Sequence, residues 1–258
     1  MARRVRRALR GVAVLLAALL GLGVGVCPAA DGLQGTLGFT TDYVHRGVSQ
    51  SAGRAAPQAS LTYWHPTGTY GGAWASRVER PVGAPGYGYP PGSRTSVELD
   101  LYLGFGTRLD ADWMVDYKAV AYLFHGDRAP VGYDYVEVAV ATAWRERLFA
   151  TVAFTPRTTW AAYGGGARSE AALVGELALQ VPVSRWLTGT LGVGQRRFDA
   201  AGPQGSRLHY EYASASLALQ LHRLGLEVGH YTTDGRARRL FGEKLAGRRT
   251  VLTATVNF

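Results

Sequence analysis

Few residues of this sequence stand at spacings that could perform catalysis or hold a metal ion. Nucleophilic catalysis needs a serine or cysteine, a base and an orienting group that converge in space. The six histidines are scattered, and none forms a recognisable arrangement with a serine: His45, His65, His125, His209, His222 and His230. The sequence contains no CxxC, HExxH, EF-hand or phosphate-binding glycine loop. We therefore expect neither an enzyme nor a bound cofactor or metal.

The ionisable residues that could act on a solute lie at alternate positions within apolar segments. Leucines alternate with Glu98 and Asp100 in one segment, and Asp116 and Lys118 take the less apolar positions of the next. A strand places successive side chains on opposite faces, so each such segment has one apolar and one polar face. A charge that faces lipid costs up to a few kcal/mol, so we expect these residues to face a wet lumen. The candidates for the lumen or its constriction are Asp42, Arg46, Arg77, Glu98, Asp100, Asp116, Lys118, Glu137, Glu176, Arg196 and Glu227, with Arg249 a further base on the polar face.

Two interpretations of these charges remain open. Acids outnumber bases among them, and charged rings sort ions in pores, so one interpretation is a pore with a mild preference for cations. The other is a set of ion pairs that fills a narrow, closed barrel. Arg46, in the first long loop, could lie at a constriction if that loop folds inward, or could only stabilise a hairpin.

The elements that must position these residues are about twelve strands of roughly ten residues, the length of a tilted strand that crosses a bilayer. Short turns and longer loops alternate between them, which predicts an all-β, antiparallel transmembrane β-barrel with short turns and both termini on the periplasmic side. The expected strands are 33–43, 56–65, 69–78, 95–106, 113–123, 133–143, 148–155, 170–181, 186–196, 208–221, 224–232 and 248–258.

A secreted β-sandwich would also alternate, but three features favour the membrane barrel. Strands in soluble proteins average about five or six residues, and these are longer. Five of the six tryptophans lie in or near an expected short turn, as an interfacial belt requires: Trp64, Trp74, Trp113, Trp144 and Trp186, although Trp64 falls on the polar face. The chain ends in Phe258, and a terminal aromatic resembles the signal that the outer-membrane assembly machinery recognises.

The first thirty residues have the pattern of a signal peptide that is removed on export. Arginines precede a continuous apolar run over residues 11–26, and small residues follow it. We therefore expect residues 31–258 to form one barrel domain. Five of the 28 Lys and Arg residues and none of the 19 acids precede residue 31, so the net charge of the rest falls from +9 to +4. The case for a nucleic-acid partner is then weak.

Several segments resemble a known family. Residues 41–51 (TDYVHRGVSQS), residues 63–76, Glu98–Tyr102 and Tyr135–Val138 are similar to motifs of the TorF-type porin family of proteobacteria. The resemblance covers residues 33–155 and implies an outer-membrane barrel with a porin label. It implies no substrate.

Together these features predict an outer-membrane channel through which small hydrophilic solutes diffuse passively. The alternative is a closed outer-membrane barrel with a structural or surface-binding role through its outer loops. Membrane lipid and lipopolysaccharide are the expected surroundings. The last long loop carries a basic cluster that we expect to contact lipopolysaccharide phosphates, with an electrostatic gate as the other interpretation: Arg236, Arg238, Arg239 and Lys244.

Overall fold

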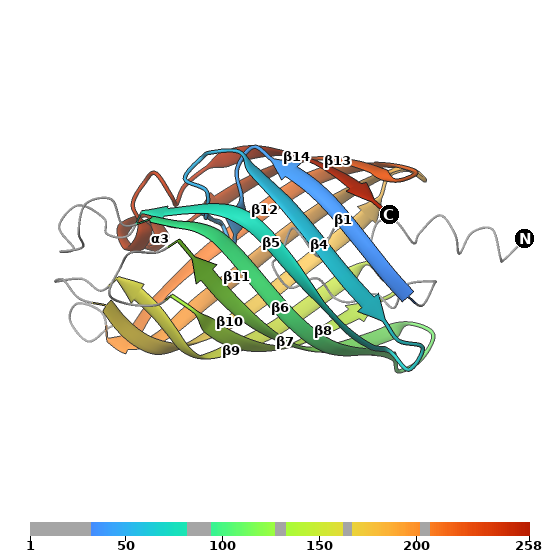
Figure 1. Cartoon of the computed structure of the whole chain (residues 1–258), viewed down its shortest axis with the longest axis horizontal. Helices are drawn as coiled ribbons and strands as arrows, with labels where there is room; N and C mark the ends of the chain where they lie inside the picture. Colours follow the sequence, from blue (N-terminus) through green and yellow to red (C-terminus); the bar gives the residue numbers. More distant parts are fainter. Residues whose placement is uncertain (1–31, 82–93, 127–132, 162–166, 202–206) are drawn as a thin grey trace, which may run out of the picture.

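The computed structural model describes residues 32–81, 94–126, 133–161, 167–201 and 207–258. Within them, twelve antiparallel strands close into one barrel, in which each strand pairs with its neighbours along the chain and β1 closes against β14 (Figure 1). The predicted fold is confirmed. The barrel strands are β1 (Gly32–Thr40), β4 (Ala56–Trp64), β5 (Thr69–Pro81), β6 (Arg94–Arg108), β7 (Trp113–His125), β8 (Tyr135–Trp144), β9 (Leu148–Ala161), β10 (Ala167–Pro182), β11 (Leu187–Ala201), β12 (Arg207–Leu221), β13 (Leu224–Thr233) and β14 (Arg249–Asn257).

The two ends of the barrel differ. At one end, the turn end, the connections are short: residues 65–68, 109–112, 145–147, 183–186 and 222–223. The opposite end, the loop end, carries the first connection, 41–55, with the short strands β2 (Val44–His45) and β3 (Val48–Ser49), and the last connection with helix α3 (Gly235–Phe241). The carboxyl terminus lies at the turn end, away from α3 (Figure 1). The expected signal peptide, residues 1–30, lies outside the described residues.

Some strands are longer than the sequence pattern predicts. The expected loop 156–169 is largely strand, because β9 and β10 remain paired as far as Ala161 and Ala167. Likewise β11 and β12 pair as far as Ala201 and Arg207, where a loop over 197–207 was expected. The continued pairing satisfies the hydrogen bonds of backbone N–H and C=O groups. The side-chain pattern does not show this pairing, because it reports only which face of a strand is apolar.

The faces of the strands divide as the alternation predicts. In β8, Val136, Val138 and Val140 are exposed on the outside, while Glu137 and its odd-numbered neighbours are buried within the barrel. Exposed leucines and valines continue this apolar outer surface over the other strands. A surface of this kind needs lipid or another apolar cover. Among the described residues, no helix is long and apolar enough to cross a membrane.

The chain terminus lies at the seam where the barrel closes. Gly35 donates to the carbonyl of Phe258 at 2.9 Å, and Phe258 donates to the carbonyl of Gly35 at 3.0 Å. A Cβ atom at residue 35 would stand 2.4 Å from the Phe258 ring, so a larger residue there would require this ring to move. Recognition of Phe258 by the assembly machinery stays a prediction.

The expected tryptophan belt is correct only in part. Trp113 and Trp186 are exposed on the outer surface close to the turn end. Trp74 was expected in the belt, but it faces the interior, where its ring centroid lies 5.1 Å from that of Tyr43. Trp64 faces inward, as its parity suggests, and packs 4.4 Å from Tyr70. Glycines and alanines surround Trp74 in the sequence, so the alternation around it is too weak to assign its face.

We expect Leu177→Arg, on the outer face well inside β10, to lower the free energy of unfolding by about 2–4 kcal/mol, because the charge would enter lipid. Leu109→Arg, in the turn after β6, is the matched control and should cost about 0–1 kcal/mol. Both leucines are exposed on the outer surface. Denaturant titration of the protein folded into vesicles measures the difference, and equal effects would contradict a lipid-facing outer surface.

Candidate functional site

The first connection of the barrel, residues 41–55, folds into the lumen at the loop end. Every residue from Asp42 to Ala52 is buried. The segment meets inward-facing side chains of several strands: Tyr43 packs on Trp74 of β5, and the His45 ring lies 6.1 Å from that of Tyr122 of β7. We call residues 42–52 the inner loop. It occupies the mouth of the barrel rather than standing outside it.

A tight hairpin forms the innermost part of the inner loop. Strands β2 and β3 pair Val44 with Ser49 and His45 with Val48, which leaves Arg46 and Gly47 as a two-residue turn. Both turn residues have positive φ, 51° and 76°, as the primed hairpin turns require. A Cβ atom at residue 47 would lie 2.6 Å from the Tyr212 Cβ atom, so glycine also allows the close approach to β12.

Arg46 projects from this turn to Glu137 of β8 in a bidentate ion pair. Its Nη1 and Nη2 atoms each donate to one Glu137 carboxylate oxygen at 2.8 Å. Both side chains are fully buried, and Thr155 of β9 donates a further hydrogen bond to Glu137 at 3.0 Å. Burial acts to lower the pKa of Arg46, but the facing Glu137 outweighs it and raises the pKa well above its ordinary value. Arg46 is therefore a fixed positive charge inside the barrel.

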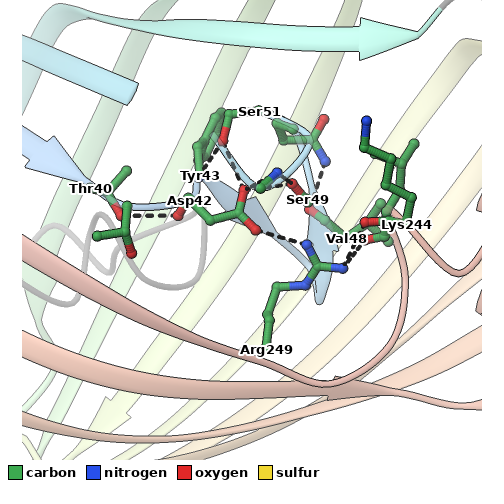
Figure 2. Close-up of polar contacts among 12 residues, drawn as sticks. Thr40, Asp42, Tyr43, Val48, Ser49, Ser51, Lys244 and Arg249 are labelled. Carbon is green, nitrogen blue, oxygen red and sulfur yellow. Dashed lines mark hydrogen bonds and ion pairs between the residues drawn. The ribbon is translucent and has the colours of Figure 1, made fainter. Parts of the chain in front are cut away.

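Asp42 organises the base of the inner loop (Figure 2). One of its carboxylate oxygens accepts hydrogen bonds from the hydroxyls of Ser49 and Ser51, at 2.6 and 2.8 Å. The other accepts from Arg249 of β14 at 2.8 Å, which ties the loop to the barrel wall. Asp42 was expected at the end of the first strand, but β1 ends at Thr40 and Asp42 belongs to the loop.

Most of the other lumen candidates face the interior. Glu98, Asp100, Asp116, Glu176 and Glu227 are buried. Lys118 and Arg196 are half-buried beside aromatic rings, 4.9 Å from the centroid of Tyr102 and 5.1 Å from that of Phe198. The structure brings Glu137 to Arg46 and Asp42 to Arg249 as direct ion pairs.

Tyrosines hold several of the interior acids. The Tyr70 hydroxyl lies 2.9 and 3.0 Å from the two carboxylate oxygens of Asp116. The Tyr212 hydroxyl donates to Glu176 at 2.6 Å. These aromatic partners carry no charge, so they do not stand out in the sequence as the acids do. Their placement on the polar face of alternating strands was the signal that could have identified them.

The prediction that Arg77 faces the lumen is wrong. Its neighbours Ser76 and Val78 are buried within the barrel, so Arg77 lies on the outer face, with its side chain 48% exposed. It lies 3.9 Å from Glu79 and donates to the carbonyl of Ala55 at 3.4 Å.

The basic cluster of the last loop is spread over α3 and the segment after it. Arg236 lies 3.6 Å from Asp234, and Arg238 lies 3.3 Å from Glu243. Arg239 and Lys244 are exposed. Acidic neighbours thus offset part of the positive charge, and contact with lipopolysaccharide phosphates stays a prediction.

Comparison with known proteins gives a family without an assigned function. A family model described as "Bacterial protein of unknown function (Gcw_chp)" matches residues 29–251. No curated protein sequence matches the chain. The family description does not include the TorF-type name, which stays a prediction.

Among solved structures, the NanC porin matches with a TM-score of 0.54 and 9% identity, over 88% of this chain and 98% of that chain. The KdgM porin matches with a TM-score of 0.48 and 6% identity, over 88% and 98% of the two chains. OmpF of Salmonella typhi matches with a TM-score of 0.47 and 11% identity, over 88% and 97%. Of these three, only NanC has a TM-score above 0.5, and at 9% identity its likeness concerns the fold alone: a porin-like closed barrel.

We expect Glu137→Gln to release the inner loop, because it would leave Arg46 buried without its counter-charge. Breaking a buried ion pair by removing one partner costs about 3–5 kcal/mol, and a loop can avoid this cost by withdrawing. The measurement is the rate of tryptic cleavage after Arg46, followed by mass spectrometry on folded protein. The rate should rise in the variant.

The matched control is Glu146→Gln, which removes the acid of the Arg108–Glu146 pair at the turn end. Its side chains are 49% and 37% exposed, and exposed pairs contribute about 0–1 kcal/mol. This variant should cleave after Arg46 no faster than the unaltered protein. If trypsin cleaves after Arg46 no faster in the Glu137 variant than in the unaltered protein, the role given to the buried pair is contradicted.

Proposed function

We propose that this chain, which belongs to the Gcw_chp family of bacterial proteins, is an outer-membrane channel through which small hydrophilic solutes diffuse passively. The passage runs along the barrel interior and is narrowed at the loop end by the inner loop. The observation that carries the proposal is the charged interior: Glu137, Asp116 and Glu176 lie inside a barrel whose outer surface is apolar.

The energetics of buried charge support a passage for polar solutes. Replacing buried ion pairs by well-packed apolar residues is often neutral or stabilising, so a barrel with only a structural role gains little from them. Fixed charges along a pore, by contrast, act directly on the solutes that pass. Arg46 and Glu137 would then form the narrowest part, because they join the inner loop to the opposite wall.

The charge balance favours cations. Of the interior candidates, seven acids (Asp42, Glu98, Asp100, Asp116, Glu137, Glu176 and Glu227) stand against four bases (Arg46, Lys118, Arg196 and Arg249). With Arg46 neutralised by Glu137 and Arg249 by Asp42, acids still outnumber bases among the remainder. We therefore infer a mild preference for small cations over anions.

One observation favours the second candidate, a closed barrel with a structural or surface-binding role. Glu98, Asp116 and Glu137 are at most 2% exposed, so in this conformation water does not reach them freely. Under our proposal the inner loop must withdraw, at least in part, before larger solutes pass. A closed barrel has no such requirement.

Single-channel conductance in a planar bilayer distinguishes the two functions. We expect small or infrequent steps from the unaltered protein, and steps several-fold larger when residues 44–49 are deleted. The deletion joins Tyr43 to Gln50, whose backbones are already hydrogen-bonded at 2.7 Å, so the barrel should tolerate it. Glu146→Gln, which removes the exposed Arg108–Glu146 pair at the turn end, is the control and should leave the conductance unchanged.

The reversal potential under a salt gradient then reports selectivity, and we expect it to indicate cations. Anion preference would contradict the inference from charge balance. Silence of both the unaltered protein and the 44–49 deletion, in properly folded samples, would overturn the channel and favour the closed barrel.

A further inference from the structure

The last loop, residues 234–248, contacts the inner loop directly. Val48 and Ala246 face each other as an isolated antiparallel bridge. Ser49 donates its backbone N–H to the carbonyl of Leu245 at 2.8 Å, and Arg249 donates to the same carbonyl at 2.7 Å. Two connections from opposite ends of the sequence thus meet at the barrel mouth.

The last loop is itself fixed to the barrel wall. Asp234 caps α3 by accepting the backbone N–H of Ala237 at 2.9 Å. The Phe241 ring meets Tyr210 of β12 edge-on, with 5.3 Å between centroids. Ala237 and Ala246 are fully buried in one apolar cluster with Val48. The opposite side of the loop is open to solvent, where Glu243 and Lys244 are exposed.

Ion pairs and apolar contacts both hold the inner loop, and they differ in energy. The desolvation of a buried ion pair largely offsets its attraction, so Arg46 and Glu137 fix the position of the loop more than they stabilise it. Burial of apolar surface is favourable without such an offset. The net stabilisation of the inner loop therefore comes largely from its apolar contacts: Tyr43 and Val44 pack on the barrel wall, and Val48 packs in the cluster that includes the last loop.

We propose that the last loop holds the inner loop in the lumen, and that its separation from Val48 and Ser49 lets the inner loop withdraw and opens the passage. This inference rests on the proposed channel function. The last loop is the part of the contact that reaches the solvent. An event outside the barrel that moves the last loop therefore also releases the inner loop.

A disulfide between the two loops tests whether they must separate before the passage opens. Val48 and Ala246 form a non-hydrogen-bonded antiparallel pair, whose Cα atoms are typically about 4.5 Å apart, within the range of a disulfide. Cys27 is the only natural cysteine and can be replaced by serine. Oxidised V48C/A246C should show few or no openings, and reductant should restore them.

The matched control is V44C/S49C, the corresponding pair within the hairpin, which leaves the inner loop free of the last loop. Its oxidised and reduced forms should conduct alike. If oxidised V48C/A246C conducts like its reduced form, separation of the loops is not needed and the proposal is overturned, while the channel itself stands.

A second measurement does not depend on conductance. A cysteine at Val44, which is buried against Tyr231 and Val251, should react slowly with a water-soluble maleimide. Adding A246E, which puts a charge into the apolar contact, should accelerate labelling about tenfold, the change that 1.4 kcal/mol produces. K244E places the same side chain on the exposed side and should change nothing.

These readouts separate the two claims. If A246E speeds labelling but the protein never conducts, the last loop does hold the inner loop in the lumen, and only the proposed channel function is refuted. Unchanged labelling with A246E, in protein that runs as a folded barrel, overturns the hold whatever the conductance.

Discussion

A guanidinium group that is withdrawn from water needs a carboxylate in the right geometry, and the inner loop depends on this constraint. Arg46 is buried only because Glu137 of β8 presents both oxygens to it at 2.8 Å. The pair fixes how deep the hairpin lies and which wall it faces. Gly47 then has to pass close to Tyr212, and the base of the loop has to meet Arg249. The barrel mouth is arranged around one buried charge.

The barrel supplies the conditions for this arrangement. Its closed hydrogen-bonded wall needs no apolar core, so charged and aromatic residues from many strands can share the interior. Acids held by tyrosines, such as Asp116 and Glu176, line the wall on either side of Glu137. The first and last loops meet above them through Val48 and Ala246. Segments that are far apart in the sequence thus come together at the mouth of the barrel.

The sequence predicts the barrel because alternation is a local property that each strand carries by itself. In regular segments such as β6 and β8, the alternation shows which face is apolar. Glu98 of β6 and Glu137 of β8 accordingly face the interior, as predicted. Alternation fails around Trp74 and Arg77, where small residues occupy both faces and nothing local distinguishes inside from outside. The inward fold of the first loop depends on Glu137, which lies 91 residues from Arg46 along the chain, and the pattern of one segment holds no information on such a partner.

The most direct test of the account is hydrogen–deuterium exchange of the first loop in protein folded into lipid. The amides of Tyr43, Ser49 and Gln50 are hydrogen-bonded within the barrel mouth, to Ser51, Leu245 and Tyr43 respectively. If the inner loop is held in the lumen, these amides exchange far more slowly than that of Ala111, which is exposed in the turn between β6 and β7. Exchange as fast as that of Ala111 would show that the loop does not stay in the lumen, and would contradict the account.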